Sequence, residues 1–123
     1  MGAFKEPHGG KLVEHYLPED TAEAMKTEAK DIPSWDMSPR QICDLDLMMC
    51  GAFSPLEGFL TEADYNGVVE DMRLESGVLW PMPITLDVSE AFAEGVNVGD
   101  TIALRDQEGV ILAVLDVSDK WSP

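Results

Sequence analysis

Two histidines and two cysteines are the residues best suited to bind a metal ion or form a covalent bond. His8 lies in a glycine-rich stretch and His15 in a short alternating stretch. No fitting third ligand stands beside them, so we expect no shared metal site. Cys43 and Cys50 would lie about 10 Å apart along one face of a predicted helix, too far for a disulfide bond within it. Because there is no Cys-x-x-Cys pair, we expect two reduced, mostly buried thiols.

The sequence lacks the loops that usually cradle phosphate groups or activate a serine. It contains no Gly-x-x-x-x-Gly-Lys-[Ser/Thr], no Gly-x-Gly-x-x-Gly and no nucleophile elbow of the form Gly-x-Ser-x-Gly. The 24 acidic side chains are most simply interpreted as a solvated surface. From its residues alone, the chain is therefore predicted to be a non-catalytic domain.

Three segments are candidate docking surfaces, each with a plainer alternative. Residues 51–60 form either a packed corner, with Phe53 and Phe59 as core anchors, or a docking loop. Residues 80–83 (WPMP) are either a rigid lead-in to a buried strand or an exposed recognition ridge. Arg105 either pairs with Asp106 or reaches towards an anionic group of a partner domain.

The candidate interdomain residues are Phe53, Ser54, Pro55, Leu56, Phe59, Trp80 and Arg105. If a partner domain normally covers them, the four large apolar members should form an exposed patch that favours dimerisation. These four are Phe53, Leu56, Phe59 and Trp80.

Helices are predicted to dominate the first half of the chain. Thr21–Lys30 is rich in helix formers, with Asp20 as N-cap and Glu23 completing a capping box. Ser38 and Pro39 begin a helix that runs to about Met49 and ends before a glycine. Its predicted buried stripe is Ile42, Leu45, Met48 and Met49, and a further helix, capped by Thr61 with Asp64, has its apolar face at Tyr65, Val68, Val69 and Met72.

Strands are predicted mainly in the second half. Ile84–Val88 alternates, and Thr101–Arg105 and Val110–Val117 form a hairpin around a Gly-ended turn. Lys11–Leu17 is a further candidate strand, preceded by an extended arm over residues 1–11. With one helical turn near Ser89–Ala93, the whole predicts an α+β domain around a small barrel or curved sheet.

Composition and charge narrow the classes of function. The 123 residues suit a single domain, and 45% are apolar, which is enough for one core. A net charge of −16 disfavours nucleic-acid binding and makes the chain unsuitable as the sole cradle for ATP and sulfate. No apolar run is long enough for a membrane span, and we see no secretory signal before Lys11. The two reduced thiols fit a cytoplasmic protein.

The segments in order resemble the amino-terminal, PUA-like domain of bacterial ATP sulfurylase (sulfate adenylyltransferase). Pro7–Val13 resembles PHGGxLV, Gln41–Leu47 the CDLEL helix, Gly51–Leu60 GGFSPLxGFM, Trp80–Val88 WPIPITLDV, and Ala103–Gly109 ALRDPEG. Ala52 and Gln107 depart from the usual Gly and Pro, and Ala52 would be strained if that position needed a positive φ. The ordered matches cover nearly the whole chain.

The resemblance implies a PUA-like pseudo-barrel with helices first and mostly antiparallel strands after them. It also implies a parent enzyme of sulfur metabolism that converts ATP, used with Mg, and sulfate into adenylyl sulfate and pyrophosphate. The family's QxRNPxHxxH and GRDHAGxG motifs lie in the following catalytic domain and do not occur here. No catalytic, cofactor-binding or metal residue is therefore carried over, and the expected partner is that catalytic domain.

Several alternatives stay open from the sequence. The chain is either an inactive domain of the enzyme, or a stand-alone PUA-like binding or regulatory module, with RNA disfavoured by the charge. The sequence does not decide whether the protein forms a homo-oligomer, nor in which physiological direction the parent reaction runs. So does the choice between an excised fragment, a truncated reading frame and a naturally short protein.

Overall fold

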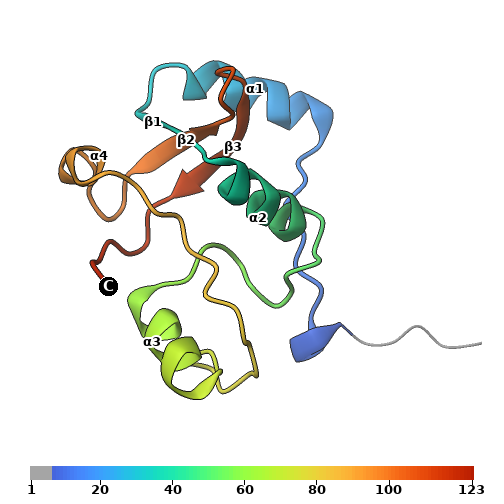
Figure 1. Cartoon of the computed structure of the whole chain (residues 1–123). Coiled ribbons are helices and arrows are strands. Elements are labelled where there is room, and N and C mark those ends of the chain that lie inside the picture. Colours follow the sequence, from blue (N-terminus) through green and yellow to red (C-terminus); the bar gives the residue numbers. More distant parts are fainter. Residues whose placement is uncertain (1–6) are drawn as a thin grey trace, which may run out of the picture.

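Residues 7–123 are described by a computed structural model, which places one small mixed sheet among helices (Figure 1). The helices are α1 (Glu19–Ala29), α2 (Pro39–Met49), α3 (Glu62–Asp71) and α4 (Glu90–Glu94), preceded by the 3₁₀ turn η1 (His8–Gly10). The strands are β1 (Ser34–Asp36), β2 (Thr101–Arg105) and β3 (Ile111–Asp116). The α+β class predicted from the sequence is confirmed.

The sheet has the order β1-β2-β3. β2 and β3 form the predicted antiparallel hairpin, with Thr101 opposite Asp116. β1 joins β2 in parallel, with Trp35 opposite Leu104, and was not predicted. Because β2 is the central strand, its residues Ile102, Ala103 and Leu104 are all buried.

The apolar side chains form two clusters, both of which include residues of α2. The first cluster surrounds Trp80 and comprises Met48, Phe53, Leu56, Leu60, Val68, Leu74, Trp80 and Ile84. The second lies on the sheet and comprises Met37, Leu45, Val96, Ile102 and Leu104. α2 contributes Met48 to the first and Leu45 to the second, and Phe59 packs against both. α3 lies at the other end of the molecule from α1, which contacts β3 (Figure 1).

The start of α2 follows the sequence prediction and adds a hydrogen-bond centre at Gln41. Ser38 caps the helix and forms a capping box with Gln41. Gln41 is 3% exposed, and its Oε1 accepts from the indole N–H of Trp35 (3.1 Å) and the backbone N–H of Ser38 (3.0 Å). Its Nε2 donates to the carbonyl of Asp87 (2.6 Å). One buried amide therefore joins β1, α2 and the segment after Trp80.

Two predicted strands are wrong, because their backbone groups bond elsewhere. In residues 11–17, Val13 donates to the hydroxyl of Ser54 and His15 to the carbonyl of Met49, so the segment follows a loop and a helix end. Residues 84–88 form no ladder, because the carbonyls of Thr85 and Asp87 accept from side chains of α2.

Other expectations near the amino-terminus and on α2 also need correction. Residues 1–6 of the predicted arm lie outside the described residues, and His8–Gly10 form a 3₁₀ turn. α1 begins at Glu19 after Pro18, so Asp20 is inside the helix and not its cap. Cys43 and Cys50 are exposed, not buried, because α2 turns Leu45 and Met48 towards the clusters.

The other helix caps and the helix stop are present, but the apolar face expected on α3 is wrong in part, because Val69 and Met72 are 60% and 51% exposed. Thr61 caps α3 by accepting from the N–H of Asp64, and Ser89 caps the short α4 by accepting from Phe92. Gly51 follows α2 with a φ of 87°, as its role as a helix stop requires. Among residues 7–123, no helix has the length and apolar character needed to cross a membrane.

Replacing Gln41 by leucine should lower the free energy of unfolding by about 3 kcal/mol, because it removes the capping box and leaves the Trp35 indole N–H and the Asp87 carbonyl without their partner. Urea unfolding followed by circular dichroism measures the change. Gln107, in an exposed turn, offers the matched control: Gln107→Leu should leave stability within about 0.5 kcal/mol of wild type. Equal effects of the two substitutions would contradict the role of Gln41.

Gly67 should not tolerate alanine, although it lies within helix α3. In an ordinary exposed helix, Gly→Ala stabilises by about 1 kcal/mol. Here the new Cβ would clash with the carbonyl oxygen of Arg73, so Gly67→Ala should destabilise by about 1 to 3 kcal/mol. Gly58 has nothing within 4 Å of its would-be Cβ, so Gly58→Ala in the same urea series should be close to neutral. A stabilising Gly67→Ala would refute the close approach.

Candidate functional site

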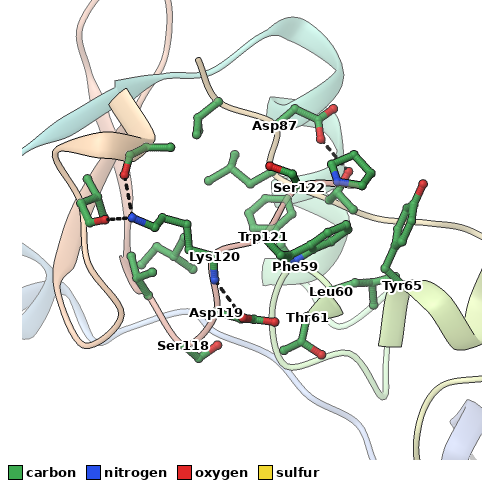
Figure 2. A pocket seen from close by; sticks show the side chains of 18 of the residues that line it. Phe59, Leu60, Thr61, Tyr65, Asp87, Ser118, Asp119, Lys120, Trp121 and Ser122 are labelled. Carbon is green, nitrogen blue, oxygen red and sulfur yellow. Dashed lines mark hydrogen bonds between the residues drawn. The ribbon is translucent and has the colours of Figure 1, made fainter. Parts of the chain in front are cut away.

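An open groove of about 830 Å³ lies beside the sheet (Figure 2). One wall is the stretch from Phe59 to Tyr65, and the other runs from Pro83 to Val96 through α4. Ile102 and Leu115 lie at its base, and the end of the chain from Ser118 to Pro123 runs along it. The groove therefore lies between the α3 region, α4 and the sheet.

The floor of the groove is an incompletely covered part of the second cluster. Five large side chains are only partly buried against that cluster and also line the groove: Phe59, Leu86, Phe92, Leu115 and Val117. Val96 and Ile102 beneath them are buried, at 5% and 2% exposed. Apolar surface of this kind on a small domain is typical of a contact site for another polypeptide or ligand.

The tail after β3 is fixed to both sides of the groove. Lys120 Nζ donates to the carbonyls of Ala93 (3.0 Å) and Val96 (2.8 Å), at the end of α4 where the helix dipole favours a cation (Figure 2). The backbone N–H of Glu62, in the first turn of α3, donates to Asp119 Oδ2 (2.8 Å). A pair of oppositely charged neighbours thus bridges α4 and α3.

Trp121 completes this attachment by packing on α3. Its ring lies 4.7 Å from the ring of Tyr65, centroid to centroid, at an angle of 45°. A contact of this kind contributes about 0.5 to 1.5 kcal/mol beyond the area that it buries. The tail therefore holds α3 in place relative to the sheet.

The charges of the groove are acidic. Asp87, Glu90, Asp116 and Asp119 line it, and Lys120 is the only Lys or Arg among the described lining residues. Because the ammonium group of Lys120 is bonded to two carbonyls, it is poorly placed to bind an anion. Across residues 7–123, no three His, Cys, Asp or Glu side chains are grouped so that they could hold a metal ion. The groove is suited to apolar and cationic groups, not to a triphosphate or sulfate.

Three of the predicted docking residues are buried, so the exposed apolar patch expected from the sequence is wrong in this respect. Phe53, Leu56 and Trp80 are 7%, 4% and 5% exposed in the first cluster. Phe53 and Trp80 meet edge to face with their ring centroids 5.7 Å apart. The burial of Phe53 and Leu56 agrees with the packed-corner alternative for residues 51–60, and the burial of Trp80 argues against an exposed ridge at residues 80–83.

The other predicted docking residues have separate surroundings. Ser54 is buried, accepts from the N–H of Val13 (2.8 Å) and donates to the carbonyl of Gly51 (2.6 Å). Pro55 is half-buried beside Gly9, and Phe59 is the one member of the set that lines the groove.

Arg105 is partly exposed and donates to the carbonyl of Gly109 (2.9 Å) within its own hairpin turn. The carboxylate of Asp106 accepts from the backbone N–H groups of Glu108 and Val110, so it serves the turn and forms no ion pair with Arg105 among the described contacts. Whether Arg105 reaches a partner domain stays a prediction.

Sequence reasoning missed the groove and its attachment residues, Asp119, Lys120 and Trp121. A charged side chain that meets the end of a distant helix leaves no periodic signal in the sequence. The one available signal was an aromatic residue beside a pair of opposite charges after the last predicted strand.

A family model, curated relatives and a solved structure all match nearly the whole of this chain. The model of the PUA-like domain family matches residues 5–123. The sulfate adenylyltransferase of Eremothecium gossypii is 44% identical over 95% of this chain and that of Desulforamulus reducens 41% identical over 97%. A solved structure described as a hexameric APS kinase from Thiobacillus denitrificans is similar over 96% of the chain, with a TM-score of 0.83 and 42% identity. The chain spans only 24%, 31% and 24% of these three proteins, respectively.

Replacing Lys120 by methionine should release the tail from α4, because it removes the donor to two carbonyls while keeping the apolar stem. We expect an exposed bond of this kind to contribute about 1 kcal/mol or less, so the fold should persist. The assigned indole N–H signal of Trp121 in an NMR spectrum should move towards its position in an unfolded chain. Lys30→Met, at the exposed end of α1, is the control and should leave that signal unchanged. An unmoved signal in both variants would contradict the attachment.

Proposed function

The chain belongs to the PUA-like domain family, and from this membership we propose that it is the non-catalytic PUA-like domain of a sulfate adenylyltransferase. In this proposal the whole enzyme joins ATP and sulfate to give adenylyl sulfate and pyrophosphate, and the domain packs on the portion that carries the catalytic residues. In this proposal the 123 residues given form one domain that contributes no catalytic residue.

The observation that carries the proposal is a contrast in coverage. The sulfate adenylyltransferases match 95% and 97% of this chain at more than 40% identity, whereas the chain spans 24% and 31% of their length. Most of each relative therefore lies outside the part that corresponds to this chain. The reaction needs residues from that larger part.

The charge distribution supports the same division of labour. Transfer of an adenylyl group between anions needs positive charge and hydrogen-bond donors that are fixed in advance. The chain has a net charge of −16, and the lysine in its groove already serves two carbonyls. The magnesium and ATP of the whole reaction are therefore assigned to the catalytic portion.

We place the protein in the cytoplasm and its parent enzyme in a homo-oligomer. Cys43 and Cys50 are free, exposed thiols, which fit a reducing compartment. The similar solved structure is described as hexameric, and the proposal extends such an assembly to the parent enzyme. Three predicted docking residues remain partly accessible for the catalytic portion: Pro55, Phe59 in the groove, and Arg105 at the hairpin.

The 123-residue chain should not catalyse ATP–pyrophosphate exchange in the presence of sulfate or molybdate, because its groove provides no free cation for a phosphate group. Incorporation of labelled pyrophosphate into ATP measures this, with a full-length sulfate adenylyltransferase as the positive control. Turnover by the chain above the no-protein blank would overturn its assignment as a non-catalytic domain.

A filter-binding titration with RNA at low salt tests the alternative of a stand-alone binding module. The proposal predicts negligible retention, because the chain has 24 acidic against 8 basic residues. Tight binding that weakens steeply with salt would replace the enzyme-domain assignment by a nucleic-acid-binding one.

A further inference from the structure

Residues 84–88 belong to no strand ladder, but two of their carbonyls are held on one side by α2. The carbonyl of Thr85 accepts from Arg40 Nη2 (3.2 Å) and the carbonyl of Asp87 accepts from Gln41 Nε2 (2.6 Å). In an extended chain, carbonyls two residues apart point to the same side, and those of the residues between them point to the other. The backbone C=O groups of Leu86 and Val88 are therefore directed away from α2.

On the side facing away from α2, the segment has a backbone hydrogen bond at Ile84 and none from the described part of the chain at the later residues. The N–H of Leu60 donates to the carbonyl of Ile84 (2.9 Å), which is the first position on this edge. No backbone partner within residues 7–123 follows at Leu86 or Val88, and both residues line the groove. An open strand edge is a template for a further strand, because its N–H and C=O groups need partners.

The residues of the groove beside this edge indicate which side chains an added strand would need. Phe92, Leu115 and Val117 offer a half-covered apolar floor. Glu90 is an exposed carboxylate among the residues that line the groove. Because neighbouring side chains of a strand point to opposite faces, one face can meet the apolar floor while the other carries cations near this carboxylate.

We propose that an extended polypeptide segment pairs in β fashion along Leu86 and Val88, with apolar residues alternating with Lys or Arg. Its source is the part of a sulfate adenylyltransferase that lies outside the PUA-like domain, and in naming that source the inference rests on the proposed function. Relatives such as the Eremothecium gossypii enzyme have most of their length outside this domain, and a segment of that remaining length could provide the added strand. A second copy of this chain, at −16, would meet the acidic groove with the same sign of charge.

A synthetic peptide of about ten residues, alternating valine and lysine, tests the chemistry on the 123-residue chain. Amide hydrogen exchange followed by NMR should slow at Leu86 and Val88 by about tenfold or more on saturation, because β pairing protects those amides. A glutamate–valine peptide of equal length is the control and should protect neither. Protection by both peptides, or by neither, would overturn the proposal.

Variants of the chain separate backbone pairing from side-chain packing. Leu86→Pro removes the N–H on the open edge and should weaken peptide binding by about tenfold or more, whereas Leu86→Ala keeps the N–H and should weaken it by no more than about threefold. Equal losses in the two variants would contradict pairing through the backbone. Should Leu86→Pro fail to fold by circular dichroism, the exchange measurement on wild type decides alone.

The charge preference has its own matched pair. Glu90→Gln should weaken binding of the lysine peptide by about threefold, because a charge beside the groove is lost. Glu70→Gln removes the same charge from an exposed position that does not line the groove and should leave binding unchanged. Equal weakening by the two substitutions would attribute the effect to net charge alone and would overturn a specific site.

Two further results would assign the open edge differently. Sedimentation that shows a dimer, with Leu86 and Val88 protected and no peptide added, would make a second copy the occupant and overturn the proposal. The absence of peptide binding would leave the enzyme-domain assignment intact, because that assignment is tested through pyrophosphate exchange and not through the groove.

Discussion

The buried amide of Gln41 is the constraint on which the arrangement of the other elements depends. It lies where β1, the start of α2 and the segment after Trp80 meet, and it bonds to all three. An amide with both acceptor and donor capacity can satisfy groups of opposite kind at once, which no apolar side chain of similar size could do. Its position fixes the segment at 84–88 against α2 and so determines which edge of that segment faces the groove.

The two apolar clusters and the groove follow from this arrangement. α2 and Phe59 connect a cluster around Trp80 with one on the sheet, and the latter remains half-covered beside the open edge. Lys120 and Asp119 then attach the tail to the end of α4 and the start of α3. A domain with this open face and a strongly acidic surface is suited to association with more polypeptide, and poorly suited to binding phosphate or sulfate. This agrees with its relationship to part of a larger sulfate adenylyltransferase.

Local signals in the sequence were sufficient for the capped helices and the hairpin. Ser38 and Thr61 are caps whose bonds span only three residues, so they could be recognised without the fold. β1 could not be found, because three residues with a parallel partner far along the chain leave no periodic pattern. The alternation at 84–88 was recognised, but whether such a segment joins a ladder depends on tertiary partners, here Arg40 and Gln41. The groove was missed for the same reason, since its walls come from stretches that are distant in sequence.

The central claim, that this chain is the PUA-like domain of a sulfate adenylyltransferase, is tested most directly in a chimera. The chain would replace the matching segment of the Desulforamulus reducens enzyme, to which it is 41% identical over 120 residues. Sulfate-dependent ATP–pyrophosphate exchange would be compared for the chimera, the parent enzyme and the same enzyme without the segment. The account predicts exchange within about tenfold of the parent for the chimera and at least about a hundredfold less without the segment. A chimera that folds and assembles like the parent, yet is no more active than the shortened enzyme, would contradict the claim.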